Sequence, residues 1–315
     1  MVQTHLTGAQ VETYGRAIEA IVRERAADWD IHGWSFQGRS PHIRLVVKVT
    51  AKRLDKHRNL SIPLPEGLGG RLKVFVRATF ARKRSPGAVP VSAGSLTGGV
   101  IAPGASIVVD HGNNQREWAG IAAILMIEGG PHILTCGHAF TFGGSREKIL
   151  VDPEEDAPIA ELTTSYFHGR PRLDAAICKL NEHGVGLLEE HSKDAISWST
   201  RFRRPRMTDN GKTAVFWATN PGSAGSYEAP ISSYTTSDSI LFGDGEIHDG
   251  FIEMPFIASG GDSGSLLSVN GSYYGICAGH VGDSTLFTPF ARVMDRVRET
   301  HPEATLWTPR KQSWP

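Results

Sequence analysis

From about Val100 onward, short apolar runs recur about every 8–15 residues, separated by Gly, Asn, Asp and Pro. The longest run, Ile121–Ile127, has the length of a strand and not the roughly 18 residues of a membrane span. Short strands separated by turn residues are typical of antiparallel barrels or sandwiches. One helix is expected here, over Phe290–Thr300. The predicted strands are Ser106–Val109, Ile121–Ile127, Ile133–Thr135, Ile149–Val151, Ala175–Leu180, Ala214–Trp217, Ser239–Phe242, Phe251–Met254, Ser265–Val269 and Tyr273–Cys277. Residues 91–315 are therefore predicted to be mostly β.

The first 90 residues have a different pattern. Apolar residues at 3–4 spacing predict a helix from Val11 to Arg25, with Thr7 as its N-cap. Apolar and polar residues alternate in His42–Val49 and Arg71–Arg77, which we expect to pair as a hairpin. The stretch 82–99 has the composition of a linker. Residues 1–90 are thus predicted to be a small α+β module.

Charge also separates the two parts. Residues 1–90 contain 16 Lys and Arg against 7 Asp and Glu, a balance of +9, and the rest of this neutral chain therefore carries −9. An acidic partner for the first module is one explanation of such asymmetry. No nucleic-acid-binding motif accompanies the basic residues, so a solvated face or a contact with the acidic part is favoured over nucleic acid. These basic residues are Lys52, Arg53, Lys56, Arg58, Arg71, Lys73 and Arg77.

Three cysteines, Cys136, Cys178 and Cys277, cannot form a disulfide framework. Their odd number, and an N-terminus without a basic and then apolar profile, favour reduced thiols in a cytoplasmic protein. The histidines and cysteines lack metal-ligand spacing, and the loop Gly243–Glu246 is expected to be a solvated turn. No metal, cofactor or membrane association is expected.

Three local signals carry chemistry. A short apolar strand leads into His138, Asp174 begins another apolar strand, and Ser263 lies among glycines just before a third. A serine that attacks an acyl carbon needs a base for its proton and a carboxylate that orients this base. It also needs backbone N–H groups directed at the developing oxyanion, and glycines give such a loop its unusual dihedral angles.

The order His138, Asp174, Ser263 and the motif Gly-Asp-Ser-Gly resemble the chymotrypsin-like (trypsin-fold) serine peptidases, over roughly Val100–Pro302. The resemblance implies two six-stranded antiparallel β-barrels after the small α+β module. It implies His138 as general base and acid, Asp174 as its orienting carboxylate and Ser263 as nucleophile. The N–H groups of Gly261 and Ser263 would form the oxyanion hole. Intracellular trypsin-like peptidases with an N-terminal extension are the relatives that the resemblance suggests.

The resemblance also places a specificity pocket. The family's spacing puts its floor near Ile257, and the strand that binds peptide would include Cys277, Ala278, Gly279 and His280. Ile257 carries no charge, so a hydrophobic or small residue before the cleaved bond is expected over Lys or Arg, whose burial without a partner charge is costly. His280 could instead favour an acidic or polar residue.

The sequence departs from the family at three places. Cys136-Gly137-His138-Ala139 lacks the usual disulfide beside the histidine, and Ser265 replaces a glycine. Asp262 has no newly released N-terminus to pair with, because about a hundred residues precede the barrels. Backbone N–H groups, an arginine of the N-terminal module or a partner protein could satisfy its carboxylate. We therefore expect a controlled activity in which the N-terminal module either orders this loop or recruits substrate.

The function predicted from the sequence is a serine endopeptidase that acts on proteins or peptides. A regulatory protein partner is one way in which its activity could be controlled. An α/β-hydrolase esterase is an alternative, although that fold requires Gly-x-Ser-x-Gly followed by a helix. A binding module that has lost catalysis would lack a member of the triad, and none is missing. The sequence does not reveal the physiological substrate.

Overall fold

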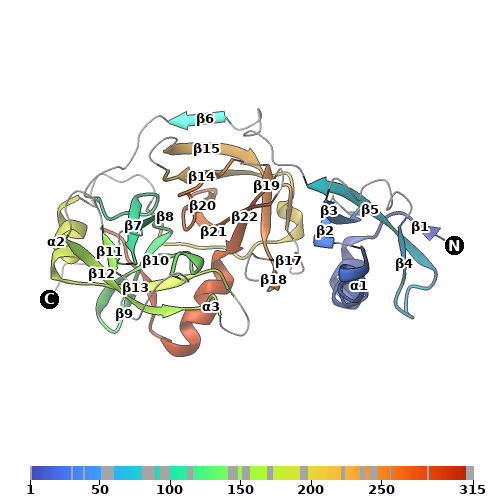
Figure 1. Cartoon of the computed structure of the whole chain (residues 1–315), viewed down its shortest axis with the longest axis horizontal. Coiled ribbons are helices and arrows are strands. Elements are labelled where there is room, and N and C mark those ends of the chain that lie inside the picture. The colour runs from blue at the N-terminus through green and yellow to red at the C-terminus, as the bar shows by residue number, and fades with distance from the viewer. Residues whose placement is uncertain are drawn as a thin grey trace.

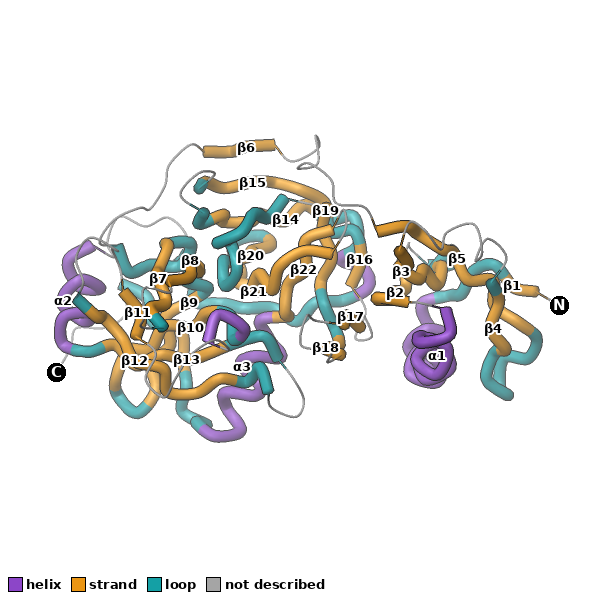
Figure 2. Tube along the Cα trace, viewed as in Figure 1, coloured by secondary structure: helices purple, strands orange, loops and turns teal. Residues whose placement is uncertain are grey.

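The computed structural model describes residues 2–29, 31–37, 40–50, 60–79, 89–92, 100–111, 116–140, 148–150, 157–168, 173–191, 198–220, 224–234, 239–241, 247–255, 257–281 and 284–309. Their strands form three sheets, one in the N-terminal module and two in the rest of the chain (Figures 1 and 2). In these residues, no helix is both long and apolar enough to cross a bilayer.

Helix α1 (Gly8–Trp29) begins with the predicted cap. The N–H of Gln10 donates to Thr7 Oγ1, and the N–H of Thr7 donates to Gln10 Oε1, which satisfies two donors at the helix start. The helix buries Ile18 and Val22 against apolar side chains of the N-terminal sheet. A helix with one apolar stripe needs such a partner, since propensity alone does not stabilise it in water.

The N-terminal sheet has the order β1-β5-β3-β2, with β4 added to β5. Strands β3 and β5 run parallel, with Leu45 opposite Val74, so the predicted hairpin between them is wrong. Each has its antiparallel partner nearer in sequence, because β3 pairs with β2 and β5 with β4. The strands are β1 (Val2–Gln3), β2 (Ile31–Gln37), β3 (Arg44–Thr50), β4 (Ser61–Pro63) and β5 (Arg71–Thr79).

The first barrel has six strands, one of them interrupted. Its sheet order is β23-β9-β10-β13-β12-β11-β7-β8. Without the added β23, the order begins at β9 and ends at β8. Only Ile121 and Ala122 separate β8 from β9, so these two strands are one continuous stretch of chain and the sheet closes. The strands are β7 (Ser106–Asp110), β8 (Arg116–Gly120), β9 (Ala123–Ile127), β10 (Gly130–Thr135), β11 (Lys148–Leu150), β12 (Pro158–Ser165), β13 (Ala176–Leu180) and the added β23 (Thr305–Leu306).

The second barrel repeats this topology. Its order is β16-β19-β22-β21-β20-β14-β15-β6, and only Ile231 and Ser232 separate β15 from β16. The predicted fold class is therefore confirmed: mostly β, with two six-stranded antiparallel barrels after a small α+β module. The strands are β14 (Thr213–Ala218), β15 (Gly225–Pro230), β16 (Ser233–Tyr234), β19 (Ile252–Pro255), β20 (Leu266–Val269), β21 (Ser272–Val281), β22 (Ser284–Pro289) and the added β6 (Val89–Ser92).

Each barrel has its own apolar core, and a third cluster joins them. In this third cluster, Leu134 of the first barrel and Ile276 of the second pack with Phe290 and Val293 of α3 (Phe290–Thr300). Helix α3 thus occupies the predicted residues. Ser263 lies on the turn before β20, and His138 follows β10, so the contact between barrels determines how these residues meet.

Helix α2 (Glu182–His191) was not predicted. Two glycines, Gly184 and Gly186, weaken its helical propensity, so the sequence pattern did not predict a helix here. Gly184 is needed for packing, because a Cβ at this position would lie 2.3 Å from the carbonyl oxygen of Ile159 on β12. The N–H of Gly184 donates to Asn181 Oδ1, as at a helix N-terminus.

A hairpin of the second barrel extends the N-terminal sheet. Strands β17 (Ser239–Leu241) and β18 (Ile247–Asp249) pair with each other, and β17 pairs with β2. Gln37 Nε2 also donates to Glu253 Oε2 on β19, at 3.3 Å. The domain boundary at residue 90 stays a prediction, and β6 at that point belongs to the sheet of the second barrel.

Candidate active site

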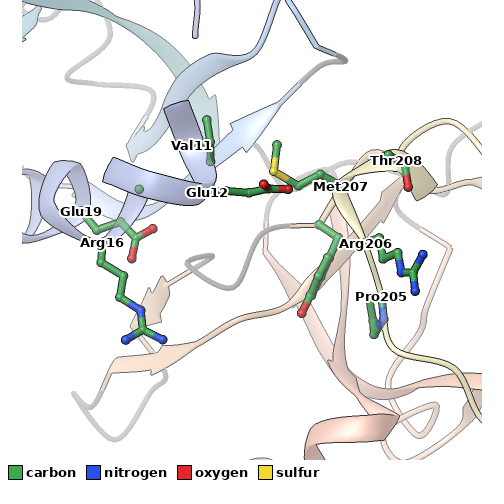
Figure 3. A pocket seen from close by; sticks show the side chains of 10 residues that line it. Val11, Glu12, Arg16, Glu19, Pro205, Arg206, Met207 and Thr208 are labelled. Atoms are coloured by element: carbon green, nitrogen blue, oxygen red, sulfur yellow. The ribbon is translucent and has the colours of Figure 1, made fainter. Parts of the chain in front are cut away.

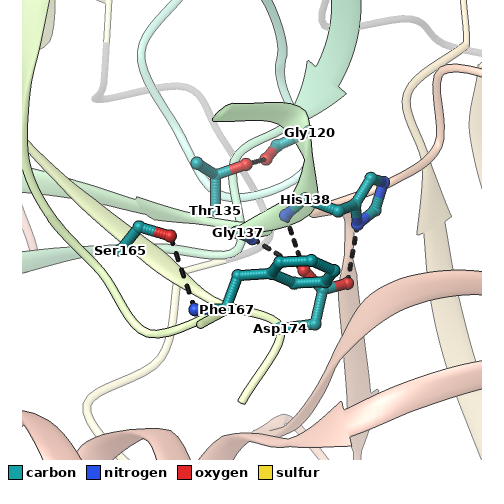
Figure 4. Close-up of polar contacts among 7 residues, drawn as sticks. All are labelled: Gly120, Thr135, Gly137, His138, Ser165, Phe167 and Asp174. Carbon is teal, nitrogen blue, oxygen red and sulfur yellow. Dashed lines mark hydrogen bonds and ion pairs between the residues drawn. The ribbon is translucent and has the colours of Figure 1, made fainter. Parts of the chain in front are cut away.

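His138 and Asp174 form a direct pair. His138 Nδ1 lies 2.7 Å from Asp174 Oδ2 (Figure 4). The histidine begins a short 3-10 helix, His138–Phe140, directly after β10, and the aspartate lies two residues before β13. Because β10 and β13 are antiparallel neighbours, with Thr135 opposite Ala176, the fold brings the two side chains together from distant parts of the sequence.

The Asp174 carboxylate is buried and held by three hydrogen bonds. Besides the imidazole, the backbone N–H groups of Gly137 and His138 both donate to Asp174 Oδ1 at 2.8 Å. Gly137 allows this approach, since a Cβ there would lie 2.9 Å from the carbonyl oxygen of Ala175. The carboxylate is thus fixed relative to the backbone that carries the histidine.

The His138 imidazole is 27% exposed, whereas Asp174 has no exposed side-chain surface. Burial acts to lower the pKa of His138, but the charge and hydrogen bond of Asp174, with a contribution from the charge of Glu117, outweigh it. The net pKa of His138 is therefore raised above its ordinary value. Both carboxylates stabilise the protonated ring, which a general base must form during acyl transfer.

The turn that carries Ser263 is held between the two barrels. The Ser263 carbonyl accepts a hydrogen bond from the N–H of Gly120 on β8, at 2.7 Å. The N–H of Gly264 donates to the carbonyl of Cys277 on β21, also at 2.7 Å. Gly264 has a φ of +84°, and a Cβ at this position would lie 2.3 Å from Thr135 Oγ1. Only glycine fits this position.

Asp262 is fully buried and is bonded by the local backbone. Its Oδ1 accepts hydrogen bonds from the N–H groups of Thr219 and Asn220 at 2.8 Å, and its Oδ2 accepts one from Ser259 at 2.7 Å. Three kinds of donor to Asp262 were expected from the sequence: backbone N–H groups, an arginine of the N-terminal module or a partner protein. The structure contains the first kind. These bonds tie the Ser263 turn to the end of β14.

His138 and Ser263 line one pocket of about 210 Å³. Glu117 and Trp118 of β8 form another part of its wall, with Ala139, Gly260 and Gly261. Neither Glu117 nor Trp118 was predicted from the sequence. No local sequence pattern marks these two residues, and in the structure 38% of the Trp118 surface is exposed.

The backbone around Ser263 also presents donors. The N–H of Asp262 donates to the carbonyl of Ser259. In the described part of the chain, the N–H groups of Gly261 and Ser263 have no backbone or side-chain acceptor. Gly261 has a φ of +93°, a conformation that side-chain-bearing residues rarely adopt. A hydroxyl, an imidazole, a buried carboxylate and free N–H donors are the groups that acyl transfer requires.

The predicted specificity residues do not line this pocket. Ile257 and Cys277 are fully buried in the core of the second barrel, and Ala278 is 5% exposed. Gly279 follows a bulge in the pairing of β21 with β22 and has a φ of +127°, and His280 is exposed. The part of these five residues in substrate binding stays a prediction.

Other candidate sites have less chemistry. The three cysteines are buried and form no disulfide, and burial raises the pKa of the Cys136 and Cys277 thiols well above the ordinary value. In the described residues no group of three His, Cys, Asp or Glu could hold a metal ion. The predicted turn at 243–246 lies outside these residues. A cleft of about 660 Å³ between α1 and residues 205–208 contains none of the predicted site residues (Figure 3).

The α/β-hydrolase fold of the esterase alternative is wrong. An α/β-hydrolase nucleophile is followed by a helix. Ser263 is followed instead by β20, which pairs with antiparallel neighbours on both sides.

The chain was compared with known proteins. No family model and no curated protein matches it. Among solved structures it is similar to Protease A of Thermobifida fusca, with 16% identity and a TM-score of 0.48 over 66% of this chain and 99% of that one. It is similar to the chymotrypsin of Cellulomonas bogoriensis, with 18% identity and a TM-score of 0.47 over 66% and 98%. A glutamic-acid-specific serine protease matches with 14% identity and a TM-score of 0.47 over 66% and 100%.

Proposed function

We propose that the chain is a serine endopeptidase that works through an acyl-enzyme intermediate. The observation that carries the proposal is the pair of His138 Nδ1 and Asp174 Oδ2, 2.7 Å apart, beside a pocket that His138 and Ser263 both line. In this proposal Ser263 is the nucleophile, His138 the general base and acid, and Asp174 the carboxylate that orients it.

Each step uses a group that is held in place. Ser263 Oγ attacks the acyl carbon while His138 Nε2 takes its proton, and Asp174 stabilises the resulting imidazolium. The N–H groups of Gly261 and Ser263 donate to the oxyanion. His138 then gives the proton to the leaving amine, and a water molecule repeats the sequence to release the acid. In this proposal the bond to Asp174 Oδ2 keeps a proton on Nδ1, so that Nε2 is the nitrogen that accepts the serine proton.

Three finer points are part of the proposal. The substrates are proteins or peptides, with a small or hydrophobic residue before the cleaved bond at a pocket near Ile257 and Cys277–His280. The activity is controlled, with the N-terminal module or a partner protein as the controlling element. The compartment is the reducing cytoplasm, which three buried cysteines without a disulfide support.

The competing function is a binding module on the same fold. Two experiments separate it from an enzyme. A fluorophosphonate probe should label the wild-type chain and fail to label Ser263→Ala, because the probe reacts only with an activated serine. His138→Ala should lose labelling as well, since it removes the base, while circular dichroism shows that both variants are folded. Equal labelling of wild type and Ser263→Ala would refute the assignment.

Cleavage-site profiling on a denatured proteome tests the substrate preference separately. We expect cleavage after small or hydrophobic residues, because no charged group is predicted at the pocket floor. Strong cleavage after Lys or Arg would overturn the placement of the pocket floor at Ile257 and leave the triad assignment untouched.

A further inference from the structure

The charges of the N-terminal module are segregated between its helix and its sheet. Strands β2, β3, β4 and β5 contain five Arg or Lys residues and no Asp or Glu. Helix α1 contains three Arg against four Asp or Glu. Of the module's net charge of +9, these strands therefore carry +5 and the helix −1.

Several of these charges surround one aromatic ring on the sheet. The guanidinium carbon of Arg44 lies 4.9 Å from the centre of the Phe75 ring, and Lys73 Nζ lies 5.7 Å from it. The His5 ring is 6.3 Å from the same ring, and His42 packs edge-on against His5 at 5.4 Å. Phe75 is partly exposed, so this basic aromatic cluster of five residues is a surface feature.

The cluster lies on the face opposite the helix. Leu45 and Val74, which precede Val46 and Phe75 along their strands, are buried in the core that α1 covers. Side chains alternate between the two faces of a strand. Arg44, Lys73 and Phe75 are therefore on the side of the sheet that the helix does not cover.

Arg44 and Lys73 have no counter-charge among the residues that the structure describes. In the described residues neither Arg44 nor Lys73 forms an ion pair with a carboxylate, and the hydrogen bond of Arg44 Nε goes to His5 Nε2 at 3.0 Å. The parallel register, with Leu45 opposite Val74, puts Arg44 and Lys73 at neighbouring positions. Like charges at neighbouring positions destabilise a sheet. A bound anion would offset this repulsion.

We propose that this sheet face binds single-stranded nucleic acid. Arg44 and Lys73 lie 4.9 and 5.7 Å from the centre of the partly exposed Phe75 ring, so two cations and an aromatic ring share one surface of the sheet. Alternation of cations with an aromatic ring is how proteins hold a strand without sequence preference, because phosphates contact the cations while bases stack on the ring or on an arginine plane. An acidic peptide would use the cations and would have no use for the ring. This proposal departs from the expectation that the basic face is solvated or contacts the acidic part of the chain.

The test is binding of the full-length chain to a fluorescein-labelled oligothymidylate of about 15 nucleotides, followed by anisotropy. Arg44→Gln with Lys73→Gln should weaken binding at least tenfold and make its salt dependence shallower by about 1.4 in the log–log slope. The matched control is Arg23→Gln with Arg25→Gln, which removes two exposed charges from α1 of the same module and should weaken binding less than about twofold.

Phe75→Leu probes the ring without changing the charge. We expect it to weaken binding about tenfold while leaving the salt slope unchanged. Circular dichroism and thermal melting of each variant separate a lost contact from a lost fold. A labelled polyglutamate peptide serves as a second ligand. Absence of binding to the oligonucleotide at low salt, equal loss in the α1 control, or polyglutamate binding as tight as oligonucleotide binding would each overturn the proposal.

Discussion

Two carboxylates act on the imidazole of His138 in different ways. Asp174 is bonded to Nδ1, and Glu117 lines the pocket and contributes only through its charge. Both raise the pKa of His138, and a base must be neutral to accept a proton. Hydrolysis should therefore rise with pH through a midpoint above about 6.5, the ordinary histidine value.

Glu117→Gln tests this electrostatic contribution. Removing the negative charge makes the imidazolium less stable, which lowers the pKa of His138 and moves the midpoint of the pH–rate profile down by about half a unit. The measurement is kcat/KM for a small peptide ester between pH 5 and 9. Glu161→Gln, on the exposed part of β12, is the control and should leave the midpoint unchanged. An upward shift in Glu117→Gln would contradict the assignment of His138 as the base.

The glycine after the serine is a steric requirement. In Gly264→Ala the new Cβ would meet Thr135 Oγ1 at 2.3 Å and the Gly120 carbonyl oxygen at 2.6 Å, at a φ of +84°. We expect a loss of at least about 2 kcal/mol in the free energy of unfolding. Gly186→Ala on α2 has open space around the new Cβ and should gain roughly 0.5–1 kcal/mol. Urea unfolding of both variants decides this, and equal stabilities would contradict the packing described for the Ser263 turn.

Part of this site could be predicted from the sequence. His138, Asp174 and Ser263 each lie beside a short apolar run with distinctive neighbours, so local patterns marked them. Glu117 and Trp118 reach the same pocket only because β8 closes the first barrel and bonds to the Ser263 turn through Gly120. Such a contact depends on strand pairing over about 140 residues of sequence, which no local pattern encodes.

At the scale of elements, the buried carboxylate of Asp209 holds residues 203–212, which lead into β14 of the second barrel. Asp209 has no exposed surface, and Arg203 Nη2 and Lys212 Nζ lie 2.8 and 2.7 Å from its Oδ1. The Tyr274 hydroxyl donates to Oδ2 at 2.9 Å, from β21. Burial acts to raise the pKa of Asp209, but these hydrogen bonds, with the Arg206 N–H and the charge of Arg203, lower it overall.

Asp209→Asn should therefore destabilise the chain by about 2 kcal/mol at pH 7, a value reduced because Arg203 and Lys212 are partly exposed. The pKa of Asp209 is lower in the folded than in the unfolded state, so its contribution is present above the unfolded value of about 3.9 and is lost as pH falls through the folded value. The difference between wild type and variant in urea unfolding should shrink below about pH 4. A difference that does not depend on pH would contradict this account.

Element pairing was predicted less well than element position. The runs at β3 and β5 were placed correctly, but their parallel pairing was not, because alternation predicts a strand and not its neighbour. Strand β4 is only three residues long and contains a proline, so the antiparallel partner of β5 left little signal. The hairpin β17–β18 pairs with β2 across about 200 residues of sequence, and no local sequence pattern predicts this pairing.

At the scale of the whole molecule, the N-terminal module is joined to the second barrel by strand pairing. β17 adds to the N-terminal sheet, and the amide of Gln37 bonds to the buried Glu253 on β19. The turn of Ser263 is ordered differently. Its buried Asp262 accepts three hydrogen bonds from backbone N–H groups of the second barrel itself. The module is thus attached to the barrel without supplying those donors.

Deletion of residues 1–88 separates two roles of the module. This deletion keeps β6, which pairs with β15. If the module recruits substrate, hydrolysis of a small peptide ester should change less than about threefold, while cleavage of a folded or nucleic-acid-bound protein falls by more than tenfold. Thermal melting of the shortened chain shows whether the barrels remain folded. A loss of ester hydrolysis in folded barrels would mean that the module orders the active site through β17 and β19, and the three backbone donors would then be insufficient to hold the Ser263 turn.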